Sequence, residues 1–241
     1  MVLGRIRSGG LDLPPNWVNR VRNERSTLVN SEEIKKVLGE PIPRAVDPQK
    51  LPPHIVEMFE PNGILERIRS KLARIRKDRN KRKKGGRFIP CEGTIASVDE
   101  DGNVYVGVSF LEHFGENEEL LAGILAHEWG HMMSDIPFNV DWNQLTWDEL
   151  HAMRRDEEGD ADGFAGRALF LMGYSPDAMI DFLNVLEKKR KDKNLQTHKY
   201  HNTATRIEIV KQSFNAAKRA MRDAEQIFGD KVKLGKVLGD A

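Results

Sequence analysis

The chain has 241 residues, and its 38 lysines and arginines against 37 aspartates and glutamates give a formal net charge of +1 at pH 7. This length allows one embellished domain or two small ones with a real core, and the balanced charge argues neither for nor against a nucleic-acid partner. No apolar run approaches the length of a bilayer span, and the first residues lack the apolar core of a signal peptide. The single cysteine, Cys91, excludes an intramolecular disulfide framework, so we expect a soluble cytoplasmic protein.

Residues 1–60 are poorly patterned and rich in proline. Apart from a short helix from Ser31 to Leu38, they are expected to form extended segments and turns that wrap or cover the rest of the chain. We place the main domain at residues 61–229 and a mobile tail at residues 230–241. The sequence of this tail gives little reason to expect that it folds back into the cleft as an autoinhibitor.

A helix is predicted from Asn62 to about Asn80, with leucines and isoleucines at the spacing of one buried stripe. Its other face is basic from residue 67, and the basic run continues to residue 84. This 67–84 segment could contact nucleic acid or an anionic membrane. A solvated face is the favoured interpretation, because no aromatic residues interleave with the charges.

The pattern changes to strands between Arg87 and Phe110. Residues 94–98 and 104–108 are predicted to form a hairpin around a turn that contains Gly and Asn. Cys91 precedes this hairpin, and a role as a latency thiol on a metal is the less favoured alternative to a structural cysteine.

The next helix is predicted to begin after Asn117, a good N-cap, and it carries the sequence His127-Glu-Trp-Gly-His131. Nearly every other residue from 120 onward is apolar or small, so this helix should be buried in the middle of its domain. Residues four apart project from one face, which lets His127 and His131 share one zinc ion. Glu128 lies close enough to act on a water molecule at that ion. The alternative is a pair of ordinary core histidines.

A second long helix is predicted from Thr146, which forms a capping box with Glu149, to about Met172. Glu158 and Asp162 share one face of this helix, bordered by small residues that allow another helix to approach. Glu158 can therefore be a third zinc ligand, and Asp162 can orient a zinc histidine. A solvated acidic patch is the alternative. Two further helices are expected, from Ser175-Pro176 to about residue 189 and from residue 203 to 228.

The HExxH sequence followed by Glu158-Gly-Asp-Ala-Asp162 resembles the gluzincin metallopeptidases of the HtpX and CAAX-prenyl-protease type, above all their small soluble relatives, the minigluzincins. The resemblance covers about residues 61–228. It implies that His127, His131 and Glu158 bind Zn²⁺, that Glu128 is the general base, and that Asp162 orients a ligand.

The chain departs from this family in two ways. It has no transmembrane segment, which argues against a lipid-embedded substrate. The family often has a histidine-proline pair and an arginine near the substrate oxyanion, whereas this chain offers His201-Asn202 and Arg206, without the proline. His201 and Arg206 are therefore candidates for stabilising the oxyanion, and His198 competes with His201.

Together these features predict an α+β fold, a mostly helical zincin-like domain with a small sheet beside the active-site helix. The predicted function is a zinc-dependent endopeptidase acting on unfolded or extended polypeptides, with an edge strand that pairs with the substrate. One alternative is a SprT-like, DNA-associated protease that would use His151 as third ligand and the 67–84 segment for DNA. Another is a latent or non-catalytic zinc-binding interaction module.

Overall fold

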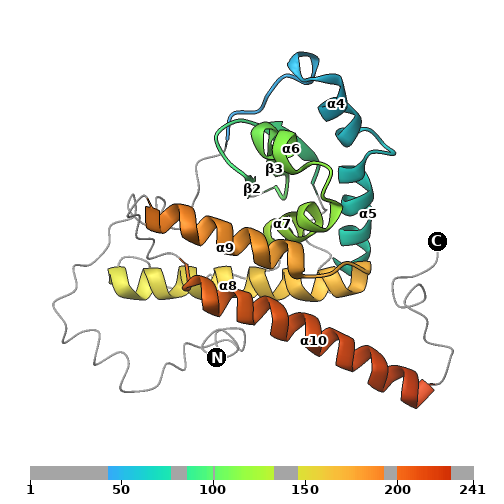
Figure 1. Cartoon of the computed structure of the whole chain (residues 1–241), viewed down its shortest axis with the longest axis vertical. Coiled ribbons are helices and arrows are strands. Elements are labelled where there is room, and N and C mark those ends of the chain that lie inside the picture. The colour runs from blue at the N-terminus through green and yellow to red at the C-terminus, as the bar shows by residue number, and fades with distance from the viewer. Residues whose placement is uncertain (1–42, 77–85, 100, 133–145, 193–199, 229–241) are drawn as a thin grey trace.

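The computed structural model of the chain describes residues 43–76, 86–99, 101–132, 146–192 and 200–228. These residues form a mostly helical body with one small sheet, so the predicted α+β class is confirmed at that level (Figure 1). The predicted helix at 31–38, the loop after His131, residue His198 and the C-terminal tail lie outside the described residues.

Within the described residues, the sheet contains the strands β1 (Phe88–Cys91), β2 (Ala96–Val98) and β3 (Val104–Gly107) in the order β1-β3-β2. The predicted hairpin is confirmed, because β2 and β3 pair antiparallel from Ala96↔Val106 to Val98↔Val104. Gly102 in its turn has φ of 84°, a conformation that glycine adopts without steric cost. β1 pairs parallel with β3 on the other side.

The segment before the main domain covers the outer edge of β1. Val46 N–H donates to Pro90 O at 2.9 Å, and Glu92 N–H donates to Arg44 O at 3.0 Å. A short 3₁₀ helix, η1 (Pro48–Lys50), and the helix α4 (Pro53–Phe59) follow. The prediction of extended structure was wrong for α4: Pro53 fits the first turn of a helix, where its missing N–H costs nothing, and Ile55 is fully buried.

The predicted helix with the basic face is α5 (Ile64–Arg76), and Leu65, Ile68 and Leu72 on its buried stripe are fully buried. The predicted strand ended at Val108 and the strand-like pattern at Phe110, whereas β3 ends at Gly107, so the prediction was wrong for residues 108–110. They begin the helix α6 (Val108–Phe114) directly after β3, and this turn of the chain buries Phe110 and Leu111 against the core.

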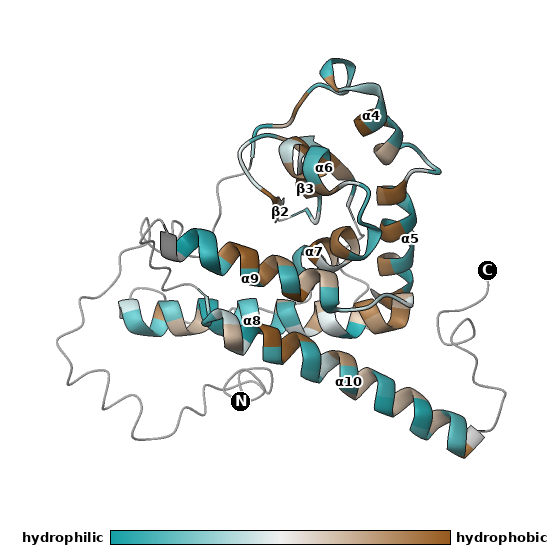
Figure 2. Ribbon diagram, in the orientation of Figure 1, coloured by the Kyte–Doolittle hydropathy of each residue, from teal (hydrophilic) through white to brown (hydrophobic). Residues whose placement is uncertain are grey.

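The HExxH helix is α7 (Glu118–His131), with the side chain of Asn117 accepting from Leu120 N–H at 3.0 Å as predicted. It lies in the middle of the body, in contact with the sheet, α5, α8 and α9. Figure 2 shows mostly hydrophobic colours on α7 and mixed colours along α10. Across the part of the chain that the structure describes, every helix is too short or too polar to span a bilayer.

Three long helices complete the body: α8 (Trp147–Met172), α9 (Asp177–Asp192) and α10 (Thr203–Phe228). The capping box of Thr146 and Glu149 is present, and α8 ends at Gly173 with φ of 81°. Helix α10 crosses beside α8 (Figure 1), so closely that a Cβ on Gly166 would lie 2.3 Å from Val210 O.

Candidate metal centre

Two helices bring the predicted ligands together. His127 and His131 lie one turn apart on α7, and Glu158 comes from the middle of α8. A Cβ on Gly130 would lie 2.7 Å from Ala161 Cα, so the two backbones are nearly in contact beside the site. This approach lets a glutamate reach the histidines: one ligand atom from each of the three residues lies within 4.8 Å of the other two.

The distances within this cluster suit a shared metal ion. Glu158 Oε2 lies 3.2 Å from His127 Nε2 and 3.7 Å from His131 Nε2. Two ligands about 2.0–2.1 Å from one tetrahedral zinc ion are separated by roughly 3.3–3.4 Å, so both values are close to what zinc requires. Glu158 is 1% exposed, and its Oε2, which faces the two histidines, makes no hydrogen bond with the described residues, whereas its Oε1 lies in an ion pair. Nitrogen and carboxylate donors in this combination fit Zn²⁺.

His127 has a carboxylate on each side of its ring. Its Nε2 faces Glu158, and its Nδ1 lies 2.9 Å from Asp162 Oδ1. Asp162 is itself held by Arg206, whose Nε and Nη2 donate to the two carboxylate oxygens at 2.7 and 2.9 Å. Asp162 therefore lies against Nδ1 while Nε2 faces Glu158, the arrangement that an orienting role for Asp162 requires.

A buried arginine, Arg154, lies between the carboxylates of Glu158 and Glu157. Its Nη2 is 2.7 Å from Glu158 Oε1, and its Nη1 is 2.5 Å from Glu157 Oε2. The other oxygen of Glu157 lies 3.5 Å from His131 Nδ1. Sequence reasoning missed Arg154 and Glu157, although Arg154 precedes Glu157 by three residues and Glu158 by four, the spacings at which side chains meet on a helix.

These charges shift the protonation of the metal-free cluster. Burial lowers the pKa of His127, but the negative charges of Asp162 and Glu158 outweigh it and raise that pKa to about 10. Burial raises the pKa of Glu158, whereas His127, His131 and Arg154 lower it to a net value of about 2. For Asp162, Arg206 and His127 likewise overcome burial, so that its pKa is about 2. A metal ion must therefore displace a proton from His127.

Two residues of the HExxH sequence are partly exposed. Between Leu120 and Met132, every residue of the chain is buried except Glu128 and His131, which are partly exposed. Glu128 is therefore both next to the predicted ligands in the sequence and accessible from outside. This carboxylate on an otherwise apolar helix is the group that the sequence predicts to act as a base.

Comparison with known proteins does not assign the chain to a family. No protein-family model matches the chain, and neither a curated protein nor a solved structure matches it. The assignment of a function therefore depends on the residues themselves.

The other predicted catalytic residues, Arg206 and His201, contact α8 and its side chains. Arg206 lies across Asp162 from His127 and stacks on Tyr200, with its Cζ 5.1 Å from the ring centroid. His201 lies against the backbone of α8, where a Cβ on Gly159 would be 3.4 Å from the His201 ring. Among the described residues, the structure does not place His201 within the candidate ligand cluster.

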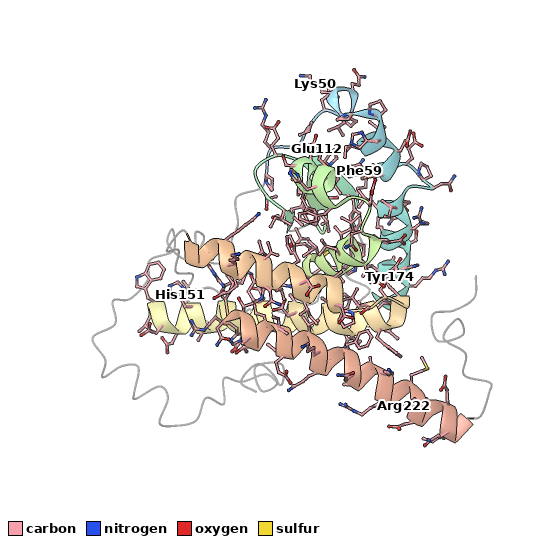
Figure 3. The ribbon with its side chains drawn as sticks, in the orientation of Figure 1. Lys50, Phe59, Glu112, His151, Tyr174 and Arg222 are labelled. Carbon is pink, nitrogen blue, oxygen red and sulfur yellow. The ribbon has the colours of Figure 1, made fainter. Side chains whose placement is uncertain are left out.

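The two residues that the alternative interpretations would add to the metal site, His151 and Cys91, lie outside the candidate ligand cluster. His151 stacks on Trp147 near the start of α8 (Figure 3), with ring centroids 5.7 Å apart, and is not in the ligand cluster. Cys91 is fully buried in β1, and burial raises its pKa to about 11, which disfavours the thiolate that a metal ligand requires.

In the described part of the basic segment, three cations have intramolecular partners. Arg67 pairs with Glu118, and Arg69 pairs with Glu66 on its own helix. Lys71 donates to the hydroxyl of Tyr174 at 2.6 Å. These contacts support a structural use of this face of α5.

Proposed function

We propose that this chain is a zinc-dependent endopeptidase of the gluzincin type that the motifs resemble, acting in a reducing compartment such as the cytoplasm. The observation that carries the proposal is the joining of two motifs by the fold. His127 and His131 on α7 and Glu158 on α8 converge within 4.8 Å, with Glu128 partly exposed beside them. A purely structural metal site has no use for an accessible carboxylate between its two histidines.

Each residue of the cluster has a part in peptide hydrolysis. At such a site zinc supplies Lewis-acid polarisation of the substrate carbonyl and a lowered pKa of a water molecule. His127, His131 and Glu158 would hold the ion. Glu128 accepts a proton from the attacking water and then donates it to the leaving amine. Asp162 and Arg206 keep the ring of His127 oriented while charge develops.

The sheet offers a place for the substrate backbone. β2 is an edge strand that packs on α7, whereas the other edge, along β1, is covered by residues 44–46. No backbone hydrogen bond joins the outer edge of β2 to another strand of the described chain. An extended peptide can add to such an edge through main-chain hydrogen bonds, so we propose an unfolded or extended polypeptide as substrate.

The test compares the wild-type chain, Glu128→Gln and the control Glu112→Gln with casein as substrate and zinc supplied. Glu112 is an exposed residue of α6, labelled in Figure 3. We expect the wild type and the control to cleave casein, and Glu128→Gln to lose at least about 100-fold in rate. All three proteins should bind one zinc ion.

The remaining outcomes separate the alternatives. If all three proteins bind zinc and none cleaves, a latent enzyme or a zinc-binding interaction module replaces the proposal. Equal cleavage by Glu128→Gln and the wild type would remove Glu128 as the base.

A further inference from the structure

We propose that Arg154 is a positioning residue that fixes two of the three metal ligands at once, Glu158 directly and His131 through Glu157. This inference depends on the proposed metal site. It concerns a residue that the HExxH and Glu158–Asp162 motifs do not include.

The first step is the contact with Glu158. Arg154 Nη2 lies 2.7 Å from Oε1 of this carboxylate, and the opposite oxygen, Oε2, faces both histidines. The arginine side chain is only 8% exposed, so this ion pair is shielded from water. Because Oε1 faces the guanidinium, Oε2 is the oxygen of Glu158 that is turned toward the histidines and a metal ion between them. Arg154 thereby selects a one-oxygen ligand over a two-oxygen ligand.

The second step is the contact with Glu157. Arg154 Nη1 lies 2.5 Å from Glu157 Oε2, which leaves Oε1 of the same carboxylate 3.5 Å from His131 Nδ1. A carboxylate near the non-ligating nitrogen fixes the ring orientation and tautomer of a metal histidine. Since Glu157 cannot turn away without losing Arg154, the arginine also restrains His131.

The third step is the shape of the guanidinium group. Its two Nη atoms present separate donors in one rigid plane, and here each donor takes a different carboxylate. A lysine keeps the charge but has a single nitrogen at the end of a flexible stem. It cannot hold both carboxylates in the same geometry. Arg154→Lys therefore separates the positioning role from simple charge balance.

The experiment titrates Co²⁺ and Zn²⁺ into the metal-free full-length chain and into Arg154→Lys, Glu157→Gln and Arg69→Lys. Arg69 is the matched control, an arginine paired with a glutamate three residues away on α5 and outside the candidate ligand cluster. We expect Arg154→Lys to bind Zn²⁺ about 10- to 100-fold more weakly. Its Co²⁺ absorption bands should weaken, because Glu158 gains a second free oxygen and the coordination number rises.

Glu157→Gln leaves the pair of Arg154 and Glu158 in place. It should weaken binding while the intensity of the Co²⁺ bands stays near that of the wild type. Arg69→Lys should match the wild type in both measurements. Circular dichroism confirms that each variant is folded.

The results separate this inference from the proposed function. A folded wild type that binds no metal would overturn both. A wild type that binds one metal ion, beside an Arg154→Lys variant with unchanged affinity and spectrum, would overturn the role of Arg154 alone. If Arg154→Lys does not fold, unchanged affinity in Glu157→Gln would still contradict the path through Glu157 to His131.

Discussion

At the scale of single residues, the site consists of alternating positive and negative side chains around two histidines. The series Arg206, Asp162, His127 and Glu158 is continuous, since each side chain lies within 3.2 Å of the next. A buried charge destabilises the folded state unless it is paired. Removing one member of the series therefore leaves the charge of its neighbour buried without a partner. Asp162, which is 0% exposed, serves His127 and Arg206 simultaneously.

Asp162→Asn should therefore weaken zinc binding by about 10- to 100-fold, because an amide orients the His127 ring less firmly than a carboxylate. It should also lower the melting temperature of the metal-free chain, because Arg206 loses its buried anion. Competition with a chelating dye and thermal denaturation measure the two effects. Asp160→Asn on the same helix is the control, and an equal loss in both variants would contradict a specific role for Asp162.

The candidate cluster of His127, His131 and Glu158 and the contact of Asp162 with His127 could be predicted from the sequence, whereas the partners of Arg206 and Arg154 could not. His127 and His131 are four residues apart on one helix, and periodicity alone puts them on one face. Arg206 is 44 residues from Asp162, so its partner depends on how α10 crosses α8. Arg154 lies on the same helix as its partners, but a sequence does not show which of several nearby carboxylates an arginine will choose.

At the scale of elements, strong local signals predicted the boundaries well. Asn117 caps α7, and Thr146 with Glu149 caps α8. Such side chains accept hydrogen bonds from the first backbone N–H groups of a helix, which have no partner within the helix. The helices α4 and α6 were missed because each has only seven residues and no side-chain cap. Their stability comes from burying Ile55, Phe110 and Leu111 in the core, which is a tertiary effect.

The contact between α7 and α8 gives a prediction at this scale. A Cβ on Gly130 would lie 2.7 Å from the backbone of Ala161, whereas a Cβ on Gly123 would meet only the side chain of Met179, at 3.0 Å. Gly130→Ala should destabilise the chain by about 1–3 kcal/mol and weaken zinc binding, since the helices must separate. The backbone of α8 cannot yield as a flexible side chain can.

Gly123→Ala is the matched control on the same helix. The side chain of Met179 can move aside, and alanine favours a helix over glycine by about 1 kcal/mol, so this variant should keep nearly wild-type stability and zinc affinity. Urea denaturation and zinc titration of both variants test the pair. Equal behaviour would contradict the importance of the close approach at Gly130.

At the scale of the whole molecule, the buried cluster links stability to pH. In the metal-free chain Glu158 and Asp162 have pKa values lowered to about 2, from ordinary values of 4.5 and 3.8. They stabilise the folded state above those ordinary values, and this contribution is lost as the pH falls through about 2. His127, with its pKa raised from 6.5 to about 10, stabilises fully below pH 6.5 and loses this contribution as the pH rises through 10.

The urea midpoint of the metal-free chain should therefore be highest between about pH 4.5 and 6.5, fall on the acid side, and fall again toward pH 10. Zinc should reverse the alkaline part of this profile. A ligating histidine is neutral, so protons compete less with the ion as the pH rises, and zinc should stabilise the chain more at pH 9 than at pH 6. Equilibrium unfolding with EDTA and with excess zinc measures both profiles. In Glu158→Gln the gap between them should close, because that variant removes both a ligand and a buried charge. A metal-free midpoint that keeps rising from pH 6.5 to 9 would contradict a protonated His127 and the charge balance of the whole cluster.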